Sequence, residues 1–508
     1  MQWGTGMLFN SIQFLVFFPI VSILYFVFPT RLRMYWLLVT SYYFYMNWNP
    51  KYALLLLFST AATYFFGLLI DASRLHTERA ALGGRKSRNW GKLWVVVCLV
   101  INLSILFFFK YFTFALDNLN AMLLWLGTNP IRPAFDVLLP VGISFYIFQA
   151  LSYTIDVYRK SIDVEKNFFR YALFVSFFPQ LVAGPIERSS NILIQLVKPR
   201  TFNLVNVRDG LLLMAWGFFQ KIVIADRAAL FVNQVFNYHA YYAGFEVLVA
   251  MLLFAVQIYC DFEGYSNIAI GSAQVMGFTL MKNFNRPYFA RSISEFWRRW
   301  HISLSTWFRD YLYIPLGGSR GGRANHHINM MIVFLVSGLW HGAAWNYVIW
   351  GGLNGLYQIV GTEFKVYRGK VLDALHVRKE SFSHRLLQMI ITFVLVDISW
   401  VFFRAASFID ATDILRSIFV SWNPWIFFDG SLFNMGLEQG QLTLLFLAIG
   451  VLLVVSFLQE RNLKLRAALA RQETWFRWAI YIIMVFTLLI YGVYGPGFAA
   501  SSFIYFQF

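Results

Sequence analysis

Residues 296–305 read FWRRWHISLS, and residues 337–342 read SGLWHG. The first run is rich in positive charge and aromatic rings, whereas the second places His341 in a run otherwise apolar enough for lipid. An ionisable side chain at membrane depth is costly, so by default it indicates a functional site. We therefore expect chemistry at this stretch, with His341 as the group that handles a proton.

The composition of the whole chain is that of a polytopic membrane protein. Of its 508 residues, 59% are hydrophobic and 13% are charged, whereas soluble domains are roughly half apolar and a quarter charged. Many windows reach the roughly 20 apolar residues that cross the hydrocarbon layer. We expect an all-α bundle with short amphipathic or re-entrant helices, formed by residues 1–508 as a single integral-membrane domain.

The net charge of +17 does not indicate nucleic-acid binding, because the basic residues lie in short loops between apolar runs. The excess of Lys and Arg in cytoplasmic loops explains this pattern. The alternation of these loops predicts roughly a dozen spans, with both termini outside. Cys98 and Cys260 lie inside apolar runs and are expected to be small buried side chains, not a disulfide or metal site.

Thirteen runs are apolar enough to be read as spans. They are residues 9–29, 35–48, 52–70, 93–116, 141–158, 207–236, 245–262, 266–278, 328–339, 343–360, 386–403, 442–458 and 478–494. Residues 1–30 hold no Lys or Arg, so they lack the basic start of a signal peptide and we expect the first span to be retained.

Two apolar runs carry interruptions. Residues 171–186 contain Pro179 and Pro185, which predicts a bent or re-entrant segment; such backbone is tolerated at membrane depth only when protein buries it or a cavity adjoins it. The span over residues 207–236 contains Lys221 and Asp226. These opposite charges are close enough in sequence to pair, which would lower the cost of insertion.

The run from Arg291 to Tyr311 is expected to form one amphipathic helix, with aromatic side chains on one side and charges on the other. Arg298, Arg299 and Arg309 lie on the charged side. These arginines are read first as a cytoplasmic anchor. The functional alternative is contact with the phosphates of an acyl-coenzyme A donor, since guanidinium groups bind phosphate bidentately.

His341 has two possible roles. It could be a core histidine bonded to a backbone carbonyl, or it could line a cavity, for which Gly338 and Gly342 leave room. The cost of a polar ring in lipid favours the cavity. A neutral imidazole can take a proton from a hydroxyl that attacks an acyl carbonyl and then return it to the leaving group. Without a serine nucleophile elbow or metal-ligand spacing, direct acyl transfer is the simplest chemistry.

At these residues the chain resembles the membrane-bound O-acyltransferase (MBOAT) family, and within it the branch of the alginate O-acetyltransferase membrane subunit. The resemblance covers nearly the whole chain through motifs at residues 140–145, 178–186, 296–305, 340–342, 399–404 and 503–508. One departure lies at Glu263 and Asn267, where the branch usually has Ser and Asp, so this motif is read as structural.

The resemblance implies a bundle pierced by a tunnel, with a catalytic core at about residues 140–362. It implies His341 and His301 as catalytic residues. The donor would be cytoplasmic acyl-coenzyme A, as acetyl-CoA, without a metal. The implied setting is the bacterial cytoplasmic membrane, with an extracellular polysaccharide and an extracytoplasmic acetyltransferase as partners.

Three other functions stay open. The chain could acylate a cell-wall polymer with D-alanyl or another acyl group. It could be a transporter or flippase of a lipid-linked or sugar substrate, since charged residues and many helices suit that class too. It could also be a scaffold that recruits secreted enzymes and turns over no acyl donor.

Overall fold

A computed structural model describes residues 6–83, 89–133, 138–182 and 184–494, and these residues form helices and loops without a strand. The chain contacts divide into two compact units, Met1–Leu211 with Ala269–Met281, and Leu212–Ile268 with Lys282–Phe508. The motif predicted at residues 503–508 and the basic residues Arg85, Lys86 and Arg88 lie outside the described residues.

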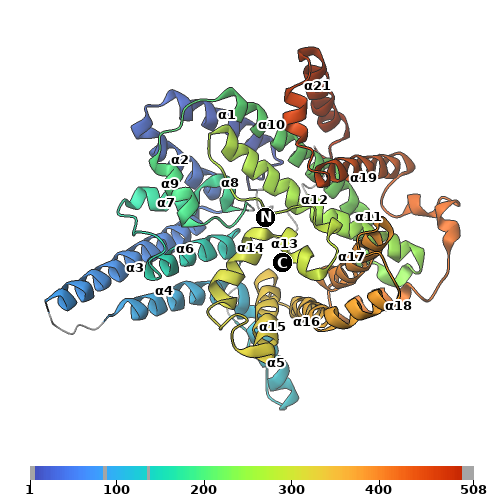
Figure 1. The fold of residues 1–508 in the computed structure, drawn as a ribbon, viewed down its shortest axis with the longest axis horizontal. Helices are drawn as coiled ribbons and strands as arrows, with labels where there is room; N and C mark the ends of the chain where they lie inside the picture. The colour runs from blue at the N-terminus through green and yellow to red at the C-terminus, as the bar shows by residue number, and fades with distance from the viewer. Residues whose placement is uncertain (1–5, 84–88, 134–137, 183, 495–508) are drawn as a thin grey trace. The chain divides into compact units, whose positions relative to one another are not determined.

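The first unit holds the helices up to the start of α10. They are α1 (Ile12–Val27), α2 (Thr30–Met46), α3 (Pro50–Leu82), α4 (Gly91–Leu106), η1 (Phe107–Tyr111), α5 (Phe112–Trp125), α6 (Ile143–Tyr158), α7 (Phe168–Ser176), α8 (Phe178–Leu181) and α9 (Ser189–Val197). In Figure 1 the blue helices α3 and α4 lie side by side, and both pack on α6.

The run at residues 171–186 is broken, as predicted. Helix α7 ends at Ser176, and α8 starts at Phe178 after Phe177, whose ψ of 112° is not helical. Side chains replace the helical hydrogen bonds that the break removes: Ser41 Oγ accepts from Phe178 N at 3.1 Å, and Gln149 Nε2 donates to Phe174 O at 2.6 Å. The segment is buried in protein, which is the condition under which lipid-depth backbone can leave the helix.

The motif at residues 140–145 contains Gly142, which directly precedes α6. The structure shows why a glycine stands there. The φ of Gly142 is +72°, and a Cβ there would lie 2.7 Å from Leu181 O. Only glycine combines left-handed backbone with such a close approach. The start of α6 is thereby packed directly against the end of α8.

The residues of α10 (Leu204–Phe218) and of α12 (Phe245–Val275) are each divided between the two units. The other elements of the second unit are η2 (Phe219–Ala225), α11 (Asp226–Asn237), η3 (His239–Tyr241), η4 (Pro287–Phe289), α13 (Ile293–Arg299), α14 (Ile302–Phe308), η5 (Arg309–Tyr313), α15 (Gly322–His341), α16 (Trp345–Ala374), α17 (Phe382–Arg404), α18 (Phe408–Ser417), η6 (Pro424–Phe427), η7 (Ser431–Asn434), α19 (Gln439–Glu460), α20 (Leu465–Ala470) and α21 (Thr474–Tyr491).

The predicted pairing of Lys221 with Asp226 is confirmed. Lys221 Nζ lies 2.8 Å from Asp226 and 2.6 Å from Asp261, and all three side chains are buried. Lys221 belongs to the π-helical segment η2, whose Ile222 carbonyl accepts a hydrogen bond from Val493 N at 2.8 Å. The end of the described chain is thus bonded to the segment that carries the buried charges.

Two predictions about single elements were wrong. Residues 245–262 and 266–278 were expected as two spans, but α12 passes through both without interruption. The run Arg291–Tyr311 was expected as one helix. It is instead divided between α13, α14 and η5, because His301 adopts a φ of 42° between α13 and α14.

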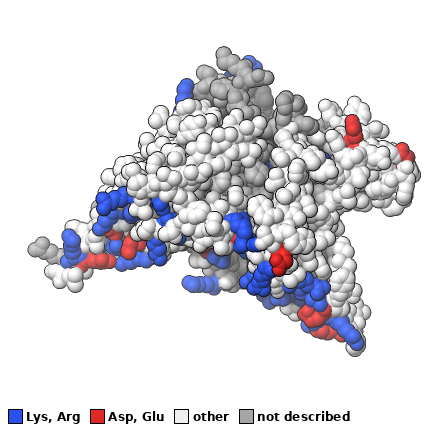
Figure 2. Space-filling view, turned by 90° about the horizontal axis from the view of Figure 1, so that it is seen from above, with Lys and Arg blue, Asp and Glu red and all other residues white. Residues whose placement is uncertain are grey.

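Among the described residues, six helices are long and apolar enough to cross a membrane: Pro50–Leu82, Gly91–Trp125, Phe245–Val275, Phe382–Arg404, Gln439–Glu460 and Thr474–Tyr491. The sequence predicted roughly a dozen spans. The expected spans outside these six helices fall on helices that are shorter or more polar. Figure 2 shows wide uncharged surface, with Lys and Arg gathered in a few groups. This distribution fits a multi-pass protein whose charges lie in loops.

Candidate functional site

His301 lies in a sharp turn that two backbone hydrogen bonds hold in place. Asn285 N donates to Arg299 O, and Ile302 N donates to Asn283 O, each at 2.9 Å. His301 itself has left-handed backbone, an uncommon conformation for a residue with a side chain. The turn ends α13 and starts α14, and it directs the imidazole into the protein, where it is 1% exposed.

Asn283 determines which nitrogen of His301 carries the proton. Asn283 Oδ1 accepts from the Ser303 hydroxyl at 2.8 Å and lies 3.4 Å from Ser303 N, while its Nδ2 donates to Ser266 Oγ at 3.1 Å. His301 Nδ1 lies 3.2 Å from this same acceptor oxygen. Nδ1 therefore donates, and the lone pair of the neutral ring is on Nε2.

His341 is the last residue of α15, next to a close crossing of α15 and α16. A Cβ on Gly338 would lie 2.1 Å from Tyr347 O, and one on Gly351 would lie 2.3 Å from Phe334 O. Small residues of this kind let two membrane helices meet backbone to backbone. The predicted room beside Gly338 is thus filled by α16, and this crossing sets the position of His341.

Aromatic rings surround His341. The ring centroids of Trp340 and Trp350 lie 5.0 Å from that of His341, and the centroid of Phe403 lies 5.4 Å away. The His341 side chain is 4% exposed. Trp350 in turn stacks on Trp400 of α17 at 5.8 Å and 18°. The imidazole is therefore held in a low-dielectric, largely aromatic surrounding.

The structure brings the two predicted histidines together. Their ring centroids are 6.4 Å apart, although 40 positions separate them in the chain. Burial lowers the pKa of His301 to about 3, so its ring is neutral at physiological pH. Two imidazoles at this separation can both contact one small reacting group between them.

The three predicted arginines lie in different environments. Arg299 contacts Glu295 at 2.6 Å and Glu460 at 3.0 Å, which fits the anchoring role. Arg309 pairs with the adjacent Asp310 at 2.8 Å and is 60% exposed in its side chain, while Arg298 is exposed. Of the three, Arg298 and Arg309 are the more accessible to a phosphate.

Several residues that shape the site were missed by the sequence reading. Asn283, Trp350 and Phe403 had no assigned role, although Phe403 belongs to the motif at residues 399–404. The usable signal was that motif, because residues 400 and 403 fall one helical turn apart and so face one side of α17. Nothing in the local sequence marks Asn283 as the partner of His301.

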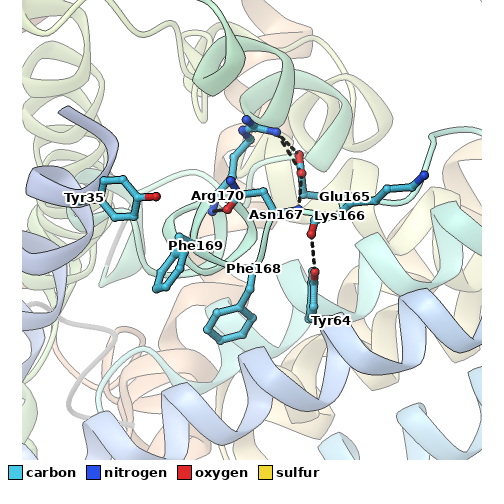
Figure 3. A pocket seen from close by; sticks show the side chains of 8 residues that line it. All are labelled: Tyr35, Tyr64, Glu165, Lys166, Asn167, Phe168, Phe169 and Arg170. Carbon is cyan, nitrogen blue, oxygen red and sulfur yellow. Dashed lines mark hydrogen bonds and ion pairs between the residues drawn. The ribbon is translucent and has the colours of Figure 1, made fainter. Parts of the chain in front are cut away.

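A surface hollow of about 540 Å³ is lined by residues of the first unit, whereas both histidines belong to the second. Figure 3 shows Arg170 bonded to Glu165 at its rim and Tyr64 bonded to the Lys166 carbonyl. The Glu165 carboxylate neutralises the guanidinium at 3.0 Å. None of the predicted site residues lines this hollow.

Comparison with known proteins supports the resemblance. Residues 156–403 match MBOAT, the membrane-bound O-acyltransferase family. The chain is 37% identical to the probable alginate O-acetylase AlgI of Pseudomonas syringae pv. tomato, over 82% of this chain and 76% of that protein. It is 34% identical to the peptidoglycan O-acetyltransferase of Helicobacter pylori, over 81% of this chain and 80% of that protein.

A more distant relative is the teichoic acid D-alanyltransferase of Bacillus subtilis, 28% identical over 44% of this chain and 59% of that protein. The matched range contains both histidines and the helices that position them. With similarity to the O-acetyltransferases extending over most of both chains, this multi-pass protein belongs to the membrane-bound O-acyltransferase family.

Proposed function

We propose that the protein moves an acetyl group from cytoplasmic acetyl-CoA across the membrane for O-acetylation of an extracellular polysaccharide. The observation that carries the proposal is the enclosed pair of His301 and His341, 6.4 Å apart. As an O-acyltransferase, the enzyme needs one group that accepts a proton from the attacking hydroxyl. A tunnel that reaches this pair from both membrane faces would let the donor and acceptor meet there.

His341 is the proton-transfer base in this proposal. The acceptor hydroxyl attacks the thioester carbonyl while His341 takes its proton. The carbon–sulfur bond then breaks, and the imidazolium returns the proton to the thiolate, so no proton is gained or lost overall. Base catalysis by a positioned side chain contributes about 10² to 10⁴-fold to the rate.

His301 is the second catalytic residue, and its surroundings favour a role other than base. Burial lowers the pKa of His301 to about 3, so its ring stays neutral, and Asn283 fixes its tautomer. With Nδ1 bonded to Asn283, Nε2 can accept a hydrogen bond from the acceptor hydroxyl. His301 would thereby orient the hydroxyl whose proton His341 removes.

The named activities of the relatives support the acceptor class. Two are O-acetylating enzymes named for alginate and for peptidoglycan, both of which are glycans. The immediate acceptor would be the glycan itself or an extracytoplasmic partner acetyltransferase. D-alanyl transfer to a cell-wall polymer is the second candidate, supported by a relative at lower identity and coverage.

For the donor, we propose that Arg298 and Arg309 contact the phosphates of coenzyme A. Both guanidinium groups reach solvent, whereas Arg299 is held by Glu295 and Glu460. Substitution of Arg298 should therefore raise the KM for the donor more than it lowers kcat.

The decisive experiment compares His341→Ala with His239→Ala, a variant in the short helix η3, in membranes with matched protein amounts. Acetyl transfer to polysaccharide should fall at least about 10²-fold in His341→Ala and stay near the starting level in His239→Ala. Full acetylation by His341→Ala would rule out the proposed role. Transport of an intact substrate without use of acetyl-CoA would favour a transporter.

A further inference from the structure

Asp397 is a buried carboxyl group that the proposed mechanism does not use. It lies in α17, one of the six apolar helices long enough to span a membrane, and its side chain is 4% exposed. Its Oδ1 has no hydrogen-bond partner among the described residues. An ionisable residue inside a span indicates a functional site by default, because burial without a partner is costly.

Three further polar atoms nearby share this condition. Asn354 Oδ1 and the indole Nε1 atoms of Trp350 and Trp400 are buried without a hydrogen-bond partner in the described parts of the chain. Native proteins satisfy most buried polar atoms, so each exception calls for an explanation. Here two acceptors and two donors occur together.

The helices place these four groups in one region. Asn354 follows Trp350 by one turn of α16 and donates from Nδ2 to the Trp350 carbonyl at 2.9 Å. Asp397 precedes Trp400 by one turn of α17, and the Trp350 and Trp400 rings stack at 5.8 Å. Since a short connection makes α16 and α17 antiparallel, Asn354 and Asp397 both lie on the side of the stacked rings that faces residues 375–381.

The same two rings border the histidine site. Trp350 contacts His341 at 5.0 Å, and Trp400 contacts Phe403 at 5.5 Å, which itself lies 5.4 Å from His341. Trp350 and Trp400 therefore form an aromatic wall that borders the His341 site, and Asn354 and Asp397 lie one helical turn from it toward residues 375–381. Residues 375–381 belong to the basic loop that the charge pattern places in the cytoplasm.

We propose that Asp397, Asn354 and the indole N–H groups of Trp350 and Trp400 form a second polar site at this wall. It binds a neutral group that both donates and accepts hydrogen bonds, because the four unsatisfied atoms are of both kinds. Water and the amide or hydroxyl portion of a substrate share this chemistry. The site stands on these contacts and does not depend on the proposed acetyl transfer.

The test is accessibility of single cysteines in a chain whose Cys98 and Cys260 are replaced by Ser. Asn354→Cys and Asp397→Cys are each reconstituted in nanodiscs and treated with 2-aminoethyl methanethiosulfonate, and modification is followed by mass spectrometry. The control is Ser399→Cys, a nearly isosteric change in the same helix. Ser399 is 1% exposed, and its hydroxyl is already bonded to Val396 O at 2.7 Å.

We expect Asn354→Cys and Asp397→Cys to react roughly tenfold faster than Ser399→Cys. This factor corresponds to a free energy of local opening that is about 1.4 kcal/mol lower at the two polar positions than at the control. Slower reaction with acetyl-CoA present would identify a substrate portion as the ligand, and unchanged reaction would identify water. If both cysteines react no faster than the control in monodisperse protein, the site does not exist. If Asp397→Cys misfolds, the comparison of Asn354→Cys with Ser399→Cys is sufficient, because that substitution removes no charge.

Discussion

Glu187, which follows the broken segment of the first unit, links the stability of the protein to pH. Its carboxylate accepts hydrogen bonds from Asn191 Nδ2 at 2.7 Å and from Met281 N. Burial nevertheless raises the pKa of Glu187 to about 7, from an ordinary value of 4.5. The folded state therefore binds more protons than the unfolded state between these two values.

This excess of bound protons means that the free energy of unfolding decreases as pH rises from about 4.5 to 7 and stays reduced above that. We expect Glu187→Gln to remove this dependence, because the amide does not titrate in this pH range. Thermal unfolding in detergent at several pH values measures it. A melting temperature that varies with pH equally in both proteins would contradict the assignment.

At the scale of residues, the two histidines could be predicted from the sequence, but the side chains that hold them in position could not. His341 is conspicuous because a polar ring in an apolar run is costly, and the charge pattern around Lys221 marks its partner Asp226 in the same helical stretch. Asn283, by contrast, reaches His301 only because a turn brings two distant segments together. A contact of that kind has no local sequence signal.

Among the helices, the crossing of α15 and α16 allows a matched comparison of two glycines. Gly338→Ala would place a Cβ 2.1 Å from Tyr347 O, which is backbone and cannot rotate away. Gly352→Ala, in the neighbouring helix, meets only Leu335 Cδ2 at 3.6 Å. We expect Gly338→Ala to lose acyl transfer and thermal stability, because His341 is displaced when the helices separate.

The control Gly352→Ala should keep its activity and gain up to about 1 kcal/mol from the better helix propensity of alanine. Acyl-transfer rates and melting temperatures of both purified variants check the prediction. Equal activity of the two variants would show that the crossing does not set the position of His341.

The π-helical segment η2 supports a second prediction at this scale. Lys221→Leu would leave Asp226 and Asp261 buried without their shared cation, a change that costs about 3 to 5 kcal/mol. The exposed pair Lys379 and Asp373, at 2.6 Å, is the control, since Lys379→Leu should cost at most about 1 kcal/mol. Comparable melting temperatures for the two variants would argue against a strong buried pair.

Element boundaries were the least predictable part of the fold. The period of the run Arg291–Tyr311 suits one helix, but the backbone turns at His301, where two bonds from residues 283 and 285 hold it. The opposite error occurred in α12, where polar residues within an apolar run indicated a break. Buried partners such as Lys221 for Asp261 keep those polar residues inside a continuous helix.

For the whole molecule, the charge pattern predicts which loops face the cytoplasm. Residues 365–385 are basic, whereas residues 404–441 carry several acidic residues, and α17 lies between them. In intact cells, a membrane-impermeant thiol reagent should label Asp429→Cys and should label Lys370→Cys only after lysis. Both positions are exposed. The reverse labelling would invert the proposed orientation.

The class of the molecule followed from composition, because a chain with so few charges cannot fold in water as an ordinary domain. Its division into two units did not follow, since contacts between distant segments decide it. The expected single domain and the core at residues 140–362 stay predictions, as does the tunnel.

The hydrogen bond from Val493 N to the Ile222 carbonyl connects the residues just after α21 to η2. It stabilises the segment that keeps a lysine and two aspartates buried together. Trimming the protein back to residue 491 would remove that connection. Any shortened variant should accordingly keep Val493, which makes this hydrogen bond.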